Sequence, residues 1–127
     1  MPTVRSVMSR CVQTIHRDTY VSEVAGIFDV ERIGAAPLVS EGGDTVGIIT
    51  KSDITRFDYV GGDPYTARAW EIANPEPSTI EASAPLEQAA RMMSEDRIHH
   101  LIVVEGDAIV GILSSLDFVT LFAEGAE

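Results

Sequence analysis

The sequence is poor in cysteine and in basic residues. A single cysteine, Cys11, excludes an internal disulfide and is typical of a protein kept in a reducing compartment. Lysine occurs once, as Lys51. Lys and Arg together number 9 against 20 Asp and Glu, which gives a formal net charge of −11. Nucleic acids and anionic membranes bind through accumulated Lys and Arg, so neither is expected as a partner.

Long apolar runs are also missing. No run approaches the roughly 18 residues needed to cross a bilayer, and the first residues lack the basic and apolar segments of a secretory signal. We therefore expect a cytoplasmic protein without a membrane-inserted segment. With 127 residues, of which 45% are hydrophobic, the chain is long enough to bury roughly two thirds of its unfolded surface in one compact fold.

Residues suited to metal binding or catalysis are scarce. His99 and His100 are adjacent, but on a strand they would point to opposite faces, and no cysteine or third histidine lies at ligand spacing. Cys11 has no histidine placed to activate it, and a lone thiol is usually inert. The sequence therefore predicts no metal, no required cofactor and no catalytic residue.

One short motif occurs twice. Residues 47–53, Gly-Ile-Ile-Thr-Lys-Ser-Asp, return at 111–117 as Gly-Ile-Leu-Ser-Ser-Leu-Asp. The aliphatic pair predicts the end of a buried strand, and the hydroxyl residue predicts the start of a helix. At such a start, free backbone N–H groups favour an anion, and an aspartate one turn in can accept hydrogen bonds from neighbouring sugar hydroxyls.

A purely structural interpretation of the motif stands beside that one. Thr50 with Asp53, and Ser114 with Asp117, also fit a capping box that only satisfies the first helical amides. Lys51 also fits both interpretations, anion binding and a purely structural helix start. Its charge opposes the helix dipole and so indicates a nearby anion, or it is a solvated surface lysine.

The duplication extends through the chain. With an offset of 65, which becomes 64 after the second hairpin, both halves predict the order helix, short strand, helix, strand, hairpin, strand, helix. We expect repeat 1 over residues 1–57, a polar linker over 58–66 and repeat 2 over 67–127. Strands this short cannot cover themselves, so helices must pack on each sheet in a mixed α+β fold.

This order of motifs resembles the cystathionine β-synthase (CBS) domain family over nearly the whole chain. Besides the duplicated motif, residues 6–9, 33–39 and 98–104 carry the resemblance. It implies a stand-alone tandem CBS pair: two β-α-β-β-α repeats with pseudo-twofold symmetry, packed through their sheets. It also implies two clefts between the repeats for adenosine-containing ligands, and a disc-like homodimer.

The resemblance also assigns roles to residues. Asp53 and Asp117 would accept the ribose hydroxyls, and Thr50 and Ser114 would bond to phosphate or ribose from the helix starts. The remaining residues would border the adenine, chiefly through backbone and shape, or face the phosphates: Val12, Gly34, Ala35, Ala36, Lys51, Ser78, His99, His100 and Leu101.

The two copies differ at the predicted site. Gly34 and Ala35 of the first copy stand where the second has His99 and His100, so we expect unequal clefts. The favoured one is built on Ser114 and Asp117, with the two histidines and the backbone of residues 34–36. Because histidine is mostly uncharged at pH 7 and other cations are few, AMP, ADP or S-adenosylmethionine is favoured over ATP.

The expected function is that of a regulatory, non-enzymatic module, for example an energy sensor, which binds an adenine nucleotide and reports the bound state. The bound state would be reported by a small rotation of one repeat against the other. Such a switch requires that the ligand bind the rotated and unrotated arrangements with different affinity. The alternative is a dimeric interaction scaffold with vestigial clefts, which docks a partner enzyme or transporter and selects it by the acidic surface.

Overall fold

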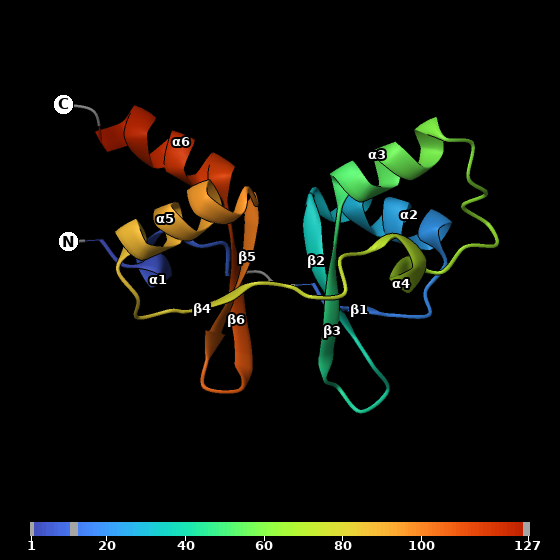
Figure 1. Cartoon of the computed structure of the whole chain (residues 1–127), viewed down its shortest axis with the longest axis horizontal. Coiled ribbons are helices and arrows are strands. Elements are labelled where there is room, and N and C mark those ends of the chain that lie inside the picture. The colour runs from blue at the N-terminus through green and yellow to red at the C-terminus, as the bar shows by residue number, and fades with distance from the viewer. Residues whose placement is uncertain (1, 11–12, 126–127) are drawn as a thin grey trace. The chain divides into compact units, whose positions relative to one another are not determined.

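The computed structural model describes residues 2–10 and 13–125. The chain forms two compact units, one made of residues 13–77 and the other of residues 1–12 together with 78–127 (Figure 1). The boundaries of these units differ from those of the predicted repeats, 1–57 and 67–127. The repeats describe the duplication in the sequence, and the units describe how the segments pack. The predicted mixed α+β fold, with a sheet and helices in each unit, is confirmed.

The unit of residues 13–77 is built on one sheet. Within the described residues this sheet has three strands in the order β1-β2-β3, with β1 parallel to β2 and β2 antiparallel to β3. Its helices lie on one face of the sheet (Figure 1). The elements are β1 (Ile15–His16), α2 (Val21–Glu31), β2 (Ala35–Val39), β3 (Thr45–Thr50), α3 (Lys51–Tyr59) and α4 (Ala69–Ile72).

The other unit repeats this plan. Its described strands follow the order β4-β5-β6, again with one parallel and one antiparallel pairing, and its helices lie on one face of that sheet (Figure 1). The elements are α1 (Val4–Val7), β4 (Thr79–Glu81), α5 (Leu86–Asp96), β5 (His100–Glu105), β6 (Ala108–Ser114) and α6 (Ser115–Gly125).

The long central helix of each unit follows the apolar spacing of the sequence. In α2 the buried residues are Val21, Val24 and Phe28, which lie on one helical face. Val24 and Phe28 belong to the hydrophobic core of their unit. Both central helices end in an arginine with positive φ, Arg32 at 56° and Arg97 at 54°. Glycine is the usual residue at this left-handed position, so the same departure from that rule occurs in both copies.

The first segment of each repeat packs on the core of the other repeat. Helix α1 joins the unit of residues 78–127, where Val4 N–H donates to the Ala84 carbonyl at 3.0 Å. Helix α4 joins the unit of residues 13–77, where Ala69 N–H donates to the Thr19 carbonyl at 2.7 Å. Val4 and Ala69 are both 0% exposed. The sequence offset could not reveal this exchange, because it shows which segments correspond but not where each one packs.

Within residues 2–10 and 13–125, each helix is too short or too polar to cross a bilayer.

Candidate functional site

Strand β3 passes directly into α3, and this helix start carries a complete capping box. The Asp53 carboxylate accepts the Thr50 N–H through Oδ2 at 2.8 Å, and Asp53 N–H donates to Thr50 Oγ1 at 3.2 Å. The structural interpretation of the motif therefore holds at this helix. The second carboxylate oxygen, Oδ1, accepts from the Arg56 guanidinium at 2.8 Å, so both oxygens of Asp53 are engaged.

Strand β6 passes into α6 in the same way, but the aspartate is less committed. Asp117 Oδ2 accepts the Ser114 N–H at 2.8 Å and lies 3.4 Å from Ser114 Oγ, which donates to it. No described residue donates a hydrogen bond to Asp117 Oδ1 or forms an ion pair with it. One carboxylate oxygen is therefore available at the start of α6, where the α3 counterpart is taken.

A carbonyl from the preceding strand entry occupies the first amide of each helix. Gly34 C=O accepts the Lys51 N–H at 2.8 Å, and His99 C=O accepts the Ser115 N–H at 2.9 Å. The first amide of each helix is therefore already engaged, so an anion at either helix start would have to use other backbone N–H groups. The reason is that the residue before each strand lies next to the following helix start, so that the carbonyl of the one accepts the amide hydrogen of the other.

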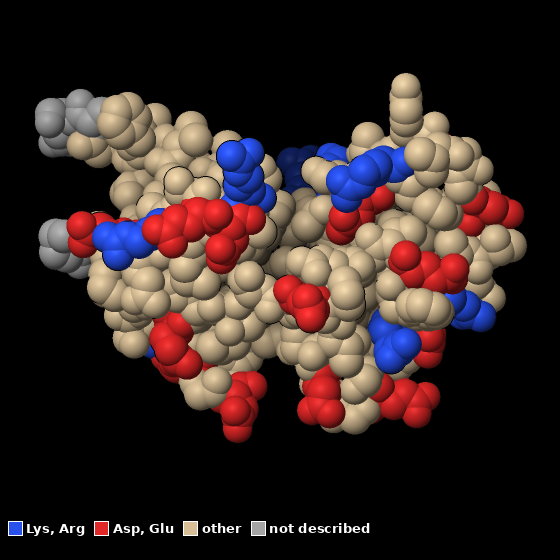
Figure 2. Space-filling view, in the orientation of Figure 1, with Lys and Arg blue, Asp and Glu red and all other residues tan. Residues whose placement is uncertain are grey.

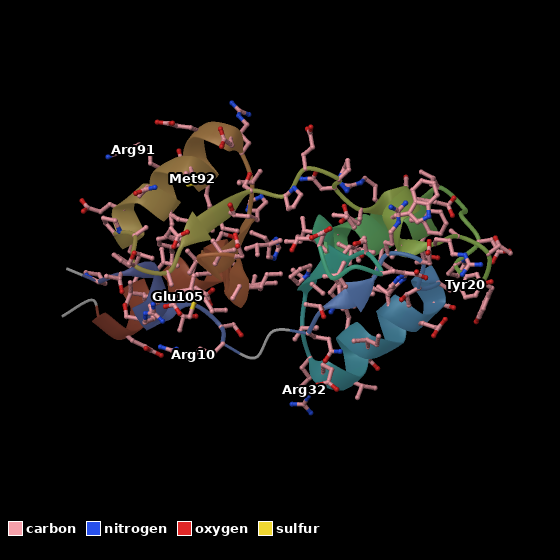
Figure 3. All side chains as sticks on the ribbon, turned by 90° about the horizontal axis from the view of Figure 1, so that it is seen from below. Arg10, Tyr20, Arg32, Arg91, Met92 and Glu105 are labelled. Carbon is pink, nitrogen blue, oxygen red and sulfur yellow. The ribbon has the colours of Figure 1, made fainter. Side chains whose placement is uncertain are left out.

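Each unit has a hollow beside its helix start, and the two hollows differ in charge. In the unit of residues 13–77 the hollow has a volume of about 340 Å³ and presents two cations, Lys51 and Arg32, and one carboxylate, Asp29. Figure 3 shows Arg32 projecting outward from its unit. The lining residues are Phe28, Asp29, Arg32, Ile33, Gly34 and Lys51.

The hollow of the other unit has a volume of about 400 Å³, is mostly apolar, and is lined by no Lys, Arg, Asp or Glu. Here His99 Nδ1 lies 3.3 Å from Ser115 Oγ at the exposed rim. The lining residues are Ala90, Met93, Ser94, Ile98, His99, Ser115 and Phe118. An apolar hollow with a few polar groups suits an uncharged aromatic ring better than a polyphosphate.

The predicted site residues fall into two groups. The unit of residues 13–77 contains Gly34, Ala35, Ala36, Thr50, Lys51 and Asp53. The other unit contains Ser78, His99, His100, Leu101, Ser114 and Asp117. Val12 lies outside the described residues.

Several of these residues can contribute only backbone or shape. Ala36 and Leu101 are 0% exposed within their strands, and Ala35 is 9% exposed. The Ser78 carbonyl already accepts the Ile102 N–H at 3.0 Å. His100 opens β5 opposite Ser114 of β6, so the sheet register places a histidine beside the motif serine.

The sequence analysis missed the pairing of Arg56 with Asp53 and the place of Phe118 beside His99. The first could have been found, because residues at i and i+3 on a helix are neighbours and an Asp–Arg pair at this spacing is favourable. For Phe118 the sequence indicated only that it belongs to the apolar face of a helix, not that it lies beside His99. Within the described part of the chain, no three His, Cys, Asp or Glu residues are grouped as metal ligands.

Two copies of a sheet with helices on one face, each with a strand that enters a helix through a hydroxyl residue and an aspartate, define a tandem pair of CBS domains. The family model of the CBS domain matches residues 4–59 and 69–124. The chain therefore belongs to the CBS domain family, and the resemblance seen in the sequence is confirmed.

Solved structures and curated relatives support this assignment. The CBS domain pair of protein MJ0100, in complex with 5′-methylthioadenosine and S-adenosyl-L-methionine, has a TM-score of 0.88 and 28% identity, with 98% of each chain covered. Hypoxic response protein 1 of Mycobacterium tuberculosis is 26% identical over 99% of this chain and 89% of its own length. CBS domain-containing protein YhcV of Bacillus subtilis is 26% identical over 90% of this chain and 81% of its own.

Proposed function

We propose that this protein is a regulatory module which binds an adenosine-containing ligand at the start of α6, with Asp117 accepting hydrogen bonds from the ribose hydroxyls. The observation that carries this proposal is the Oδ1 of Asp117, to which no described residue donates a hydrogen bond. Its neighbours in α6, Ser115 and Phe118, line the apolar hollow of the same unit, and Asp117 itself does not. A similar CBS domain pair, that of MJ0100, was solved with two adenosine derivatives. A carboxylate oxygen without a partner can accept hydrogen bonds from the hydroxyls of a vicinal diol, and its charge strengthens them.

The charges of the described residues favour a ligand with few negative charges. The hollow in the unit of Asp117 is lined by apolar side chains together with Ser94, His99 and Ser115, without Lys or Arg. A triphosphate placed there would meet no permanent cation in a protein of net charge −11. We therefore place 5′-methylthioadenosine, S-adenosylmethionine and AMP ahead of ADP, and ADP ahead of ATP. The backbone of residues 34–36 lies in the other unit, and its part in the site stays a prediction.

Ligand identification and titration test this proposal together. We expect mass spectrometry to identify an adenosine derivative that leaves the purified protein on denaturation. Alternatively, calorimetry of the ligand-free protein should show that 5′-methylthioadenosine or S-adenosylmethionine binds at least tenfold more tightly than ATP. Guanosine, which offers the same diol on a different base, is the control for base recognition. Absence of any adenosine derivative in both measurements would reject the proposed function.

The alternative function, an interaction scaffold, is favoured by the apolar surface of α6. The exposed fractions are 67% for Leu116, 61% for Val119 and 76% for Phe122, and no described residue of α6 is buried. Figure 2 shows an uncharged surface over α6, above the charged residues of α5 in the same unit. Contiguous exposed apolar side chains mark association sites, and we infer that α6 contacts a second copy of the chain.

We expect Phe122→Glu to convert a homodimer into a monomer, because the new charge would be buried without a partner. Light scattering after size exclusion, near 10 µM protein, measures the mass of each species. Tyr65→Glu, which changes another aromatic residue that is 75% exposed, is the matched control and should leave the mass unchanged. A wild-type protein that is monomeric at all concentrations would contradict self-association through α6.

A further inference from the structure

The two helix starts differ in one ion pair. Arg56 donates to Asp53 Oδ1 at 2.8 Å from the position one turn further along α3. The residue at the corresponding position of α6, at the offset of 64, is Thr120. Threonine has no charge to offer Asp117, which keeps its Oδ1 without a described partner.

We propose that Arg56 is the residue that makes the two copies bind ligand unequally, by occupying the carboxylate oxygen which a ribose would need. This inference rests on the proposed function, because it concerns which of two equivalent aspartates can accept the diol. Arg56 would act through Asp53 and need not touch the ligand, so it is a specificity-determining residue that works by competition.

The surroundings of Asp53 make the competition effective. The Asp53 side chain is only 12% exposed, and its Oδ2 is held by the Thr50 N–H in the capping box. Oδ1 is therefore the one oxygen of Asp53 that could be released without opening the start of α3. Arg56 is 68% exposed and can swing into solvent, so its pairing lowers the affinity of this site without abolishing it.

The size of the effect follows from the exposure of the arginine. Exposed ion pairs of this type change an equilibrium by up to about fivefold. We therefore expect a change of affinity of about that size at each site when the pair is removed or introduced. An effect of this size is measurable by calorimetry when the ligand is uncharged, because the lost or added charge then acts on the ligand only through the aspartate.

A reciprocal exchange of the two residues tests the proposal, with 5′-methylthioadenosine as the probe. Thr120→Arg introduces the competitor next to Asp117 and should weaken binding about fivefold. Arg56→Thr, made in a protein that also carries Asp117→Asn, should strengthen the residual binding about fivefold over Asp117→Asn alone. Gain of affinity on removal of a side chain is not expected of a merely structural residue.

Arg91→Thr is the matched control, because it removes the same charge from an exposed position. Figure 3 shows Arg91 at the outer surface of α5, pointing away from its unit. This control should bind within about twofold of wild type, since Arg91 is exposed, does not line the hollow, and carries a solvated charge that is largely screened at physiological salt.

The outcomes separate this inference from the proposed function. If wild type binds the probe and Thr120→Arg binds it equally well, the role of Arg56 is rejected while the adenosine site stands. If Arg56→Thr weakens the residual binding, Arg56 assists the ligand and the inference is again rejected. If Asp117→Asn leaves no measurable heat, the Thr120→Arg comparison decides alone. Failure of wild type to bind any adenosine derivative rejects both proposals.

Discussion

Asp117→Asn is expected to weaken the binding of 5′-methylthioadenosine by roughly 10- to 100-fold. The amide keeps an oxygen for the Ser114 N–H, which Asp117 Oδ2 accepts at 2.8 Å, but it removes the charge that would strengthen the bonds from the ribose hydroxyls. Hydrogen bonds to a charged group contribute about 1.5–3 kcal/mol, and each 1.4 kcal/mol changes an affinity tenfold. Calorimetric titration of ligand-free protein measures the change.

The stability of this variant distinguishes binding from capping. We expect the loss of unfolding free energy to stay below about 1 kcal/mol, because the Ser114 N–H keeps a partner and only the favourable interaction with the helix dipole is lost. Asp107→Asn, in the hairpin between β5 and β6 of the same unit, is the control and should bind like wild type. A strongly destabilised Asp117→Asn protein with unchanged affinity would assign Asp117 to the helix cap alone.

Gly47→Ala is expected to lower the free energy of unfolding by about 1–3 kcal/mol. A Cβ on Gly47 would lie 2.8 Å from the carbonyl oxygen of Asn74, and its next neighbours are also backbone atoms, of Asn74 and Pro75. Asn74 and Ile48 exchange two backbone hydrogen bonds, of 2.9 Å and 3.0 Å, so the segment cannot retreat without breaking them. Overpacking of this kind costs about the stated amount.

Thermal unfolding checks this expectation, with a decrease of Tm of roughly 3–5 °C per kcal/mol for a chain of this size. Gly26→Ala is the matched control, because nothing lies within 4 Å of the added Cβ and the residue is inside helix α2. There alanine should raise stability by about 0.5–1 kcal/mol. If both variants behave alike, the close approach of Asn74 to Gly47 does not constrain the fold.

Much of the fold could be predicted from residue spacing. The central helices follow their apolar positions, and the duplicated motif marked where each strand enters a helix. The motif glycines carried a further signal that was not used, since glycine within a strand indicates close approach of another backbone. At Gly111 that approach is real: an added Cβ would lie 2.7 Å from the Ser9 carbonyl oxygen.

The candidate site was harder to predict, because its two copies differ in the hydrogen-bond partners of individual carboxylate oxygens. Thr50–Asp53 and Ser114–Asp117 look alike in sequence, but only in the first pair does the aspartate amide donate to the hydroxyl. The neighbours of each carboxylate, Arg56 and Thr120, lie outside the repeated motif. Which oxygen is left for a ligand therefore depends on contacts that a motif does not contain.

The exchange of first segments makes the unit of residues 13–77 an insertion within the other unit. The polypeptide consequently passes from one unit to the other twice, at residues 12–13 and 77–78, as an inserted domain does in its host. Two covalent tethers restrict relative movement more than one tether would. In the proposed regulatory module, any movement of one unit against the other would therefore have to displace both crossings at once.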